Sequence, residues 1–321
     1  MQCRICHNSE DNIIYNIREM MFGFRDEFEY FQCSQCNCLQ LSHFPKNILK
    51  YYPDNYYSFS PVTQIATIRP FWDKMRYNYL LFRKGVLGKY FYNKYPFDDP
   101  LFLNQIYLLQ QIYLTKKTRI LDVGCGQGEF LYNLAKSSLK TLLGIDPFIA
   151  EDIIHNKKLK ILKKDISEVG GHWDIVMFHH SFEHIPNPEE TLQAVSRLLS
   201  NGGVCLLRIP IVPSFAWEHY KENWVQLDAP RHFFLHSQES IRILSEKANL
   251  TLKKIIYDSN IFQFIGSELY LRDIPLQHNH PFNIKSMFSE ADIKMYSDEA
   301  ERLNKERKGD QAAFYLIKKE K

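Results

Sequence analysis

The sequence predicts an α/β fold in which a mostly parallel sheet is covered by helices. From Thr118 onward, apolar runs of strand length alternate with segments of helical period, the pattern of a parallel sheet with helices on both faces. The first run leads into "DVGCGQGEF", a glycine-rich stretch placed where a strand would end and a helix begin. Five of the seven cysteines fall within the first 38 residues, which indicates a separate N-terminal module.

Each element of the α/β part is predicted from its own stretch of sequence. Short apolar runs predict strands at 119–123, 141–145, 159–162, 173–178 and 203–209. The segments between them predict helices at 128–137, near 148–155 and at 188–200. Ser237 is a suitable N-cap for a helix over "SQESIRILSEKANL". "TLKKIIYDS" and "QAAFYLIKK" predict the last two strands, with a helix around 289–308 between them.

The composition divides the chain into three ranges. Residues 1–48 carry the cysteine pairs among short β-like stretches, and we interpret them as a zinc-ribbon-like module. Residues 49–115 begin with many aromatic side chains and then become helical in period, which predicts a linker and cap. Residues 116–321 contain the alternating strands and helices, so we expect them to form the ligand-binding α/β domain.

The overall composition is that of an ordinary globular protein, with 45% hydrophobic and 24% charged residues. A net charge of +3 is too small to indicate nucleic-acid binding by itself. No apolar run approaches the roughly 20 residues of a membrane-spanning helix. The first residues, "MQCRICHNSE", do not have the pattern of a secretion signal, so we expect a cytoplasmic protein.

The glycine-rich loop differs from the two common phosphate-binding motifs. A dinucleotide fingerprint needs glycine at its sixth position, but counting from Gly124 that position is Glu129. A P-loop needs a final Gly-Lys-Ser/Thr, whereas this loop reads "GQGEF". A loop without a cation, with Asp122 at its entrance, suits a ligand that carries an ammonium group. Asp146 ends the next strand, where a carboxylate can bind both hydroxyls of a ribose. A purely structural turn is the alternative interpretation.

These motifs resemble those of the class I S-adenosylmethionine (SAM) methyltransferases. "ILDVGCGQGEF", "LLGIDP" and "KKDISE" are similar to the first three motifs of that family, and "WDIVMFHHSFEHIPNP" and "GGVCLLRIP" to its fourth and fifth strands. The resemblance implies a Rossmann-like sheet of seven strands, mostly parallel with the last antiparallel, and SAM as cofactor. It also implies a set of cofactor-binding residues, namely Asp122, Gly124, Cys125, Gly126, Gly128, Asp146, Pro147, Phe148, Asp165, Ile166 and His179.

The same resemblance implies that each of these residues contacts a particular part of SAM. Asp122 would lie near the amino group of SAM, above a loop that passes beneath its methionine part. Asp146 would hold the ribose, and Asp165 with the backbone of Ile166 would meet the adenine edge. Phe148 could pack on the adenine ring, while His179 would border the sulfonium.

The reaction that this resemblance implies needs few protein groups. A sulfonium methyl is already electrophilic, so the enzyme has to align the acceptor and remove its proton. Candidate bases are His180, Glu183 and His184 after the fourth strand, and Asp228, Arg231 and His232 further along the chain. We favour His232 or His184, because histidine suits general-base work near neutral pH. We expect Arg231, in "LDAPRHFFLHS", to anchor the substrate, and Tyr57 to reach the active site through its phenol. A structural role is the alternative for each.

The cysteines indicate a metal. Cys3 with Cys6 and Cys33 with Cys36 form two CxxC pairs separated by 26 residues, which supply the four thiolates of a structural Zn²⁺ site. Chance clustering or a redox pair is the alternative. Three further side chains leave the ligand choice open, namely Cys38, His7 and His43, and Cys38 could replace Cys36.

The order of the modules resembles that of sugar C-methyltransferases and related polysaccharide-pathway enzymes. In both, a cysteine knuckle runs into a stretch like "CLQL", a tyrosine-bearing segment like "DNYYSF" follows, and the SAM domain comes last. This resemblance implies a sugar or nucleotide-sugar acceptor in surface-polysaccharide biosynthesis.

Two further hypotheses come from other classes of protein. The first is a ribosomal-RNA methyltransferase, whose knuckle would bind RNA; the small net charge and the lack of a basic stripe disfavour it. The second is a non-catalytic SAM-binding protein, which the surplus histidines disfavour. The sequence leaves the methylated atom and the oligomeric state open.

Overall fold

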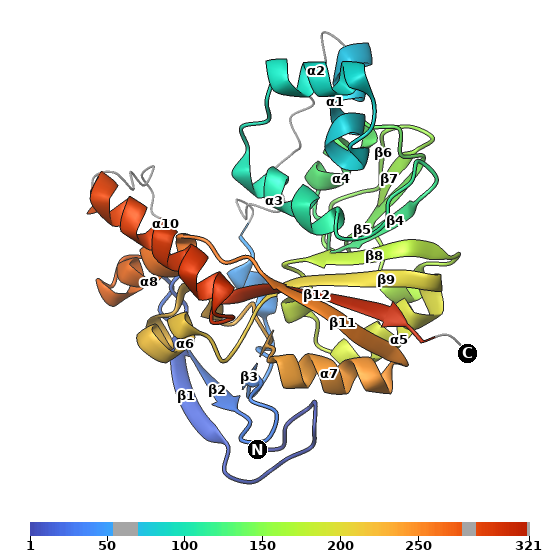
Figure 1. Ribbon diagram of the computed structural model, residues 1–321. Helices are drawn as coiled ribbons and strands as arrows, with labels where there is room; N and C mark the ends of the chain where they lie inside the picture. The colour runs from blue at the N-terminus through green and yellow to red at the C-terminus, as the bar shows by residue number, and fades with distance from the viewer. Residues whose placement is uncertain (54–69, 278–286, 320–321) are drawn as a thin grey trace. The chain divides into compact units, whose positions relative to one another are not determined.

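The computed structural model describes residues 1–53, 70–277 and 287–319 (Figure 1). Two compact units are found, and each is made of separate stretches of the chain. The first unit comprises Met1–Pro53, Phe182–Leu192 and Arg208–Phe314. The second comprises Asp54–Ser181, Gln193–Leu207 and Tyr315–Lys321. Within the described residues, no helix has both the length and the apolar character needed to cross a bilayer.

The main sheet has eight strands in the order β11-β12-β9-β8-β4-β5-β7-β6. Their bounds are β4 Arg119–Val123, β5 Thr141–Ile145, β6 Ile153–Ile154, β7 Leu159–Leu162, β8 Trp173–His179, β9 Leu199–Pro210, β11 Leu250–Tyr257 and β12 Gln311–Lys318. Strand β4 pairs in parallel with both β5 and β8, and β5 pairs in parallel with β7. The predicted α/β fold class is therefore confirmed, with the short β6 as an eighth strand.

Burial explains why these runs form strands. In β4 the four residues from Ile120 to Val123 are buried, including the acidic Asp122, as expected for a strand in the middle of a parallel sheet. The prediction of a helix near 148–155 is wrong. This segment turns and forms β6, whose Ile153 and Ile154 pair antiparallel with β7, a role that suits β-branched side chains.

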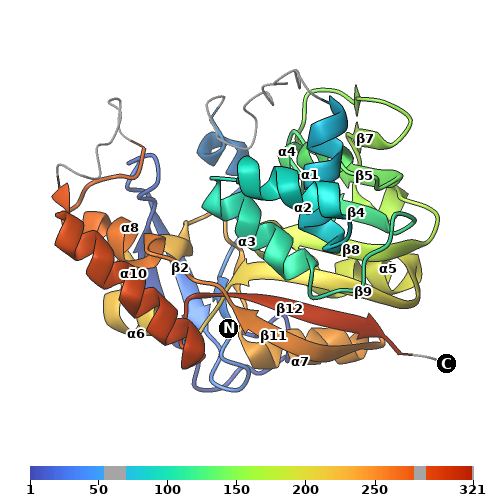
Figure 2. The same ribbon diagram turned by 45° about the horizontal axis from the view of Figure 1, so that its top comes forward.

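Helices of the second unit flank its strands. They are α1 Pro70–Phe82, α2 Val86–Lys94, α3 Pro100–Leu109 and α4 Glu129–Ala135, and α5 Pro188–Leu198 begins in the first unit and ends in the second. Figures 1 and 2 show α1 and α2 side by side. Hydrogen bonds join α1 to the region of α4, from Tyr77 to Asn133 and between Asn78 and Ser138. The predicted helical character of this region is thus present in the described part of 49–115.

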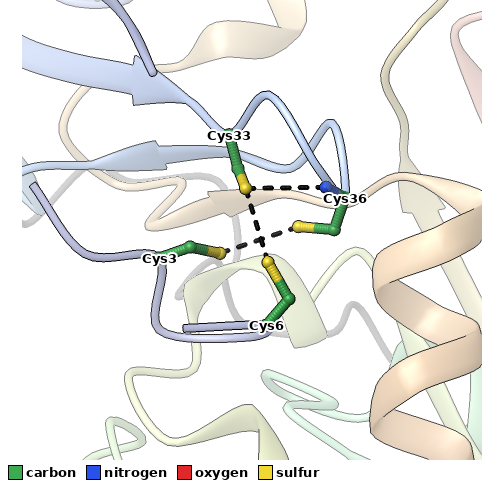
Figure 3. A group of neighbouring side chains, drawn as sticks. All are labelled: Cys3, Cys6, Cys33 and Cys36. Carbon is green, nitrogen blue, oxygen red and sulfur yellow. Dashed lines mark hydrogen bonds between the residues drawn. The ribbon is translucent and has the colours of Figure 1, made fainter. Parts of the chain in front are cut away.

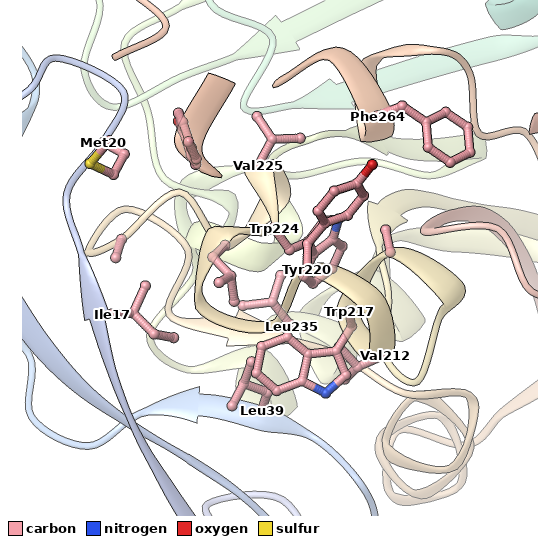
Figure 4. Close-up of a cluster of buried hydrophobic side chains, with 14 of the residues drawn as sticks. Ile17, Met20, Leu39, Val212, Trp217, Tyr220, Trp224, Val225, Leu235 and Phe264 are labelled. Atoms are coloured by element: carbon pink, nitrogen blue, oxygen red, sulfur yellow. The ribbon is translucent and has the colours of Figure 1, made fainter. Parts of the chain in front are cut away.

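The first unit contains a second, four-stranded sheet in the order β1-β2-β3-β10. Its strands are β1 Ile13–Arg18, β2 Glu27–Gln32, β3 Leu39–Leu41 and β10 Phe234–Leu235, all in antiparallel pairs. Figure 4 shows Leu39 of β3 and Leu235 of β10 beside Trp217 in the core of this unit. The N-terminal strands therefore share both a sheet and a hydrophobic core with residues from the C-terminal half of the chain.

Within the described residues, four helices complete the first unit. They are α6 Phe215–Tyr220, α7 Gln238–Lys247, α8 Phe262–Leu271 and α10 Glu290–Lys305. The capping residue Ser237 of α7 was predicted, and its hydroxyl accepts from the Ser240 N–H in a capping box. Short 3-10 turns also occur, of which η3 Ile166–Glu168, η4 Phe182–His184 and η6 Val225–Leu227 carry or adjoin site residues. The sequence did not predict α6 and α8.

Candidate active site

Two positions in the loop after β4, Gly124 and Gly128, require glycine. Gly124 and Gly128 have φ values of +71° and +79°, which L side chains rarely adopt. A Cβ on Gly124 would lie 2.4 Å from the Cβ of Ser181, and one on Gly128 would lie 2.4 Å from the Cδ1 of Ile161. Gly128 is also the N-cap of α4. Backbone atoms are therefore all that this loop can present to a ligand at these two positions.

Asp122, in β4 just before this loop, has a buried carboxylate oxygen that no other described residue satisfies. Its side chain is buried, and its Oδ1 atom has no hydrogen-bond partner within the described residues. Burial, together with the nearby charge of Asp146, raises the pKa of Asp122 well above the ordinary value. A buried polar atom without a partner is costly, and a ligand cation would satisfy it. This observation fits the predicted ammonium group.

Asp146 follows β5 and organises the backbone on both sides of the predicted ribose site. Its Oδ2 accepts from the Gly126 N–H at 2.9 Å, and its Oδ1 accepts from the Phe148 N–H at 2.8 Å. Each carboxylate oxygen has a second lone pair, which two ribose hydroxyls could use. Burial raises the pKa of Asp146, and the two hydrogen bonds oppose that effect. Pro147 and Phe148 are exposed, and Phe148 retains 58% of its accessible surface.

The remaining predicted SAM contacts follow neighbouring strands of the same unit. Asp165, after β7, is the N-cap of η3, and Ile166 beside it is buried. His179 is the last residue of β8, with its ring edge-on to Phe130 at 5.2 Å between centroids. The thiol of Cys125 is enclosed, and burial raises its pKa. Because the carboxyl ends of parallel neighbours share one edge of a sheet, the structure brings this predicted set together.

The predicted bases divide between the two units. His180 belongs to the second unit and has a left-handed backbone with φ of 53°. In the first unit, the ligating atoms of Glu183, His184 and His232 all lie within 4.8 Å of one another. Glu183 and His184 follow the end of β8 after only a few residues of chain. Tyr57, the other predicted catalytic residue, lies outside the described residues.

Hydrogen bonds orient both imidazoles of this group. The Nδ1 atom of His184 lies 2.9 Å from the Arg231 carbonyl oxygen and 3.2 Å from the Tyr52 hydroxyl. The Nδ1 atom of His232 lies 2.7 Å from the Gln226 carbonyl oxygen. A carbonyl oxygen only accepts, so we assign the proton of each neutral ring to Nδ1. Each Nε2 therefore has a lone pair that can take a proton or bind a cation.

Burial and neighbouring charges shift the pKa values of side chains in and around the group of Glu183, His184 and His232. Burial lowers the pKa of His184 to about 4, and the neighbouring His232 contributes to the shift. The side chain of Glu183 has no exposed surface. Burial opposes ionisation of Asp228, but the guanidinium of Arg231 holds the pKa of that carboxyl below its usual value. His184 therefore remains neutral at physiological pH beside two acidic side chains.

Arg231, the predicted substrate anchor, is completely buried. Its Nε and Nη2 atoms donate to Asp228, Nη2 also donates to Glu19 at 2.8 Å, and Nη1 donates to the Tyr51 carbonyl at 2.9 Å. These bonds place Arg231 as a structural cation that holds the segment carrying His232. They do not support a direct substrate contact. Glu19 could not be predicted from the sequence, since no local motif links it to a residue 212 positions away.

The four predicted metal ligands converge in the first unit. Figure 3 shows the thiols of Cys3, Cys6, Cys33 and Cys36 directed toward one another from two loops. The sulfur atoms of Cys3 and Cys36 are 3.6 Å apart, and those of Cys6 and Cys33 are 3.4 Å apart. In tetrahedral Zn²⁺ with bonds of about 2.3 Å, sulfurs are separated by about 3.8 Å. The donor set and its spacing therefore fit Zn²⁺.

The surroundings of the cysteines also resemble a metal site. Gln40 donates from Nε2 to the sulfur of Cys3 at 3.1 Å, and the Cys36 N–H donates to the sulfur of Cys33 at 3.5 Å. Such bonds orient thiolate ligands. Cys38 is buried but lies outside the group of four, and His7 and His43 are exposed and also outside it. Among the described residues, the group thus consists of the two CxxC pairs.

Comparisons with known proteins agree with this geometry. Residues 100–255 match the family described as "Methyltransferase domain". A ubiquinone biosynthesis O-methyltransferase from Nitrosospira multiformis is 28% identical over 124 residues, which cover 32% of this chain and 48% of that protein. The matched region thus spans about half the length of that curated relative.

Solved structures to which this chain is similar have low sequence identity and TM-scores below 0.5. A cyclopropane synthase from Mycobacterium tuberculosis has a TM-score of 0.43 and 16% identity, with 66% of this chain and 82% of that chain covered. A SAM-dependent methyltransferase from Archaeoglobus fulgidus has a TM-score of 0.42 and 20% identity, with 72% and 99% covered. The match over residues 100–255 shows a methyltransferase domain in that part of the chain, and the sheet with its glycine loop after β4 has the Rossmann-like fold of class I SAM-dependent methyltransferases.

Proposed function

We propose that this chain transfers the methyl group of SAM to a small-molecule acceptor, a sugar or nucleotide-sugar of surface-polysaccharide biosynthesis. The observation that carries the cofactor assignment is the buried Asp122 carboxylate, whose Oδ1 atom has no partner within the described residues beside a loop that requires glycine. The relative named as a ubiquinone biosynthesis O-methyltransferase favours a small-molecule acceptor. The sugar class rests on the "CLQL" and "DNYYSF" stretches described above.

Each predicted residue has a defined task in this proposal. Bound SAM supplies an electrophilic methyl group. Asp122 accepts a hydrogen bond from the ammonium, Asp146 binds the ribose hydroxyls, and Asp165 with the backbone of Ile166 meets the adenine edge. The lone pair on Nε2 of His184 or His232 accepts the proton that the methyl acceptor loses. Arg231 and Glu19 act on this reaction only by positioning the His232 segment.

The acceptor class can be tested with SAM that carries a labelled methyl group. Purified protein and labelled SAM are incubated with an extract of the source cells, which is then separated into RNA and small-molecule fractions. We expect label among the nucleotide sugars, at a rate that falls in the His232→Ala variant. Label in RNA would contradict the proposal and assign the cysteine module to RNA binding. Heat-inactivated protein is the control for non-enzymatic methylation.

We also propose that Cys3, Cys6, Cys33 and Cys36 bind one structural Zn²⁺ per chain, within a zinc-ribbon-like module over residues 1–48. The module supports the His232 segment, because the Leu41 N–H donates to the Phe233 carbonyl at 3.0 Å and Tyr30 donates from its hydroxyl to the His232 carbonyl at 2.8 Å. Zinc removal should therefore loosen that segment as well as the cysteine loops.

Metal analysis and thiol titration test the zinc proposal. Purified protein should contain one zinc per chain, and the four cysteines should become reactive toward a thiol reagent only after chelation. The Cys33→Ser variant should lose the metal, whereas Cys205→Ser, in the buried part of β9, should retain it. Protein without zinc and with all N-terminal thiols reactive before chelation would exclude the site.

A further inference from the structure

The geometry points to a second metal site, separate from the cysteine cluster. We propose that Glu183, His184 and His232 bind a divalent transition-metal ion of the Mn²⁺ or Fe²⁺ type. Two imidazoles and a carboxylate are a donor set that such ions prefer, whereas four thiolates favour Zn²⁺. The ligating atoms of the three residues already lie within 4.8 Å of one another.

The orientation of the histidines supports metal binding. In metal sites the ligating imidazole almost always donates its other N–H to a carbonyl or carboxylate, which fixes the tautomer and the plane of the ring. Both rings meet this condition here, since Nδ1 of His184 bonds to the Arg231 carbonyl and Nδ1 of His232 bonds to the Gln226 carbonyl. The ring centroids are 4.7 Å apart at an interplanar angle of 72°. Both Nε2 atoms are therefore the nitrogens that remain for a ligand role.

The distances around His232 fit an ion better than direct hydrogen bonds. Its Nε2 atom lies 3.8 Å from Glu183 Oε1 and 3.8 Å from Asp228 Oδ2. These separations exceed the length of a hydrogen bond. Two ligands at about 2.1 Å from one ion are separated by about 3.0 Å in a cis arrangement and about 4.2 Å in a trans arrangement. Asp228 therefore provides a fourth donor close to the proposed ion.

The ligands are held in place before any ion binds. The Phe233 N–H donates to the Glu183 carbonyl at 2.9 Å, which ties η4 to the segment that carries His232. The Arg231 guanidinium fixes Asp228, and the side chains of Glu183 and His232 are 0% and 7% exposed. Water is largely excluded, so charge interactions in this group are stronger than at the surface. Preorganised, buried ligands of this kind favour tight binding.

The role of the ion rests on the proposed function, although its binding does not. A divalent ion at this site would act as a Lewis acid on an acceptor oxygen and would lower the pKa of that hydroxyl. In that case His184 and His232 would serve as ligands, and the ion would make proton loss easier.

Manganese binding can be measured by electron paramagnetic resonance, in which free Mn²⁺ gives a strong signal that diminishes on binding. The full chain is treated with a mild chelator, dialysed and titrated with Mn²⁺, a hard ion with little preference for thiolates. We expect one bound Mn²⁺ per chain. Glu183→Gln and His232→Asn should each weaken it by about 100-fold or more, because even the loss of an outer-sphere partner costs 10- to 100-fold. The exposed His172→Asn is the matched control and should bind as the wild type.

Two results would overturn the site. One is the absence of Mn²⁺ binding by the wild-type chain up to millimolar concentration, and the other is unchanged binding in both variants. The isosteric Glu183→Gln variant keeps the buried volume, and circular dichroism with SAM titration confirms that each variant is folded. Because the readout needs no acceptor, methyl transfer by a chain that binds no Mn²⁺ would leave the proposed function standing while excluding this metal site.

Discussion

At the scale of single residues, the predicted cofactor site depends on carboxylates placed at strand ends. Asp146 holds the loop backbone through the N–H groups of Gly126 and Phe148, so its position is fixed before a ligand arrives. Asp122 is different, because its Oδ1 atom has no partner within the described residues and the protein environment disfavours its charge. We therefore infer that Asp146 shapes the site and that Asp122 responds to the charge of the ligand.

This difference predicts that SAM binding is coupled to proton release. Burial and the charge of Asp146 raise the pKa of Asp122, so its carboxyl is protonated over a wider pH range than an ordinary aspartate. A bound ammonium favours the ionised form, so affinity should increase as pH rises through this pKa. Calorimetry in buffers of different ionisation enthalpy measures the protons released. The Asp122→Asn variant should release fewer, and equal release by both proteins would contradict the assignment.

His232 should affect turnover more than cofactor binding. The proposed role of its Nε2 atom concerns the acceptor, while the predicted SAM contacts come from the second unit. His232→Ala should therefore reduce kcat by at least about 100-fold, a typical contribution of proton transfer, with a SAM dissociation constant within about threefold of the wild type. A near-wild-type rate would transfer this role to His184 or to a tyrosine. His219→Ala, on the exposed side of α6, is the control.

At the scale of elements, the pairing of β3 with β10 connects the N-terminus to the segment that carries His232. Leu39 and Gln40 pair with Leu235 and Phe234, which brings the cysteine-bearing N-terminus to the segment after Arg231. The buried Arg231 adds a second connection through Glu19 and Asp228. Contacts with residues near the N-terminus thus stabilise the conformation of the "LDAPRH" stretch.

The Arg231 connection should matter for stability. Arg231→Leu would leave Glu19 and Asp228 buried without their cation, and breaking a buried pair in this way typically costs about 3–5 kcal/mol. We expect the free energy of unfolding from urea titration to fall by that order. Arg242→Leu, at an exposed ion pair on α7, should change it by less than about 1 kcal/mol. A loss for Arg231→Leu no greater than for Arg242→Leu would refute a structural role.

The accuracy of sequence prediction also differs between elements. The parallel strands were predicted because burial on both faces gives continuous apolar runs such as "RILDV". The predicted helix near 148–155 failed because pairing of Ile153 and Ile154 with β7 outweighed a weak local pattern. Helix α6 was missed, since "FAWEHY" spans only six residues and its Ser214 cap has no distinctive spacing. Local periodicity thus predicted the sheet but not the elements defined by tertiary contacts.

At the scale of the whole molecule, each compact unit combines stretches that are far apart in the sequence. The first unit gathers three separate stretches around one core, including Trp217, Trp224 and Leu39. The spacing of residues within each motif predicted that the two CxxC pairs come together and that a glycine loop follows the first strand of the α/β part. The Glu19–Arg231 pair and the tautomers of His184 and His232 could not be predicted, since they depend on contacts between distant residues or on backbone carbonyls.

Calorimetric titration of SAM into the purified chain measures whether the glycine loop and Asp146 form a SAM site. We expect one SAM bound per chain. In a folded Asp146→Ala variant the affinity should fall by about tenfold or more, as expected for the loss of hydrogen bonds to a charged group. The His172→Asn variant, altered at an exposed side chain, should bind as the wild type. Absence of binding by the wild-type chain, or unchanged affinity in Asp146→Ala, would contradict the assignment of this loop and carboxylate to SAM.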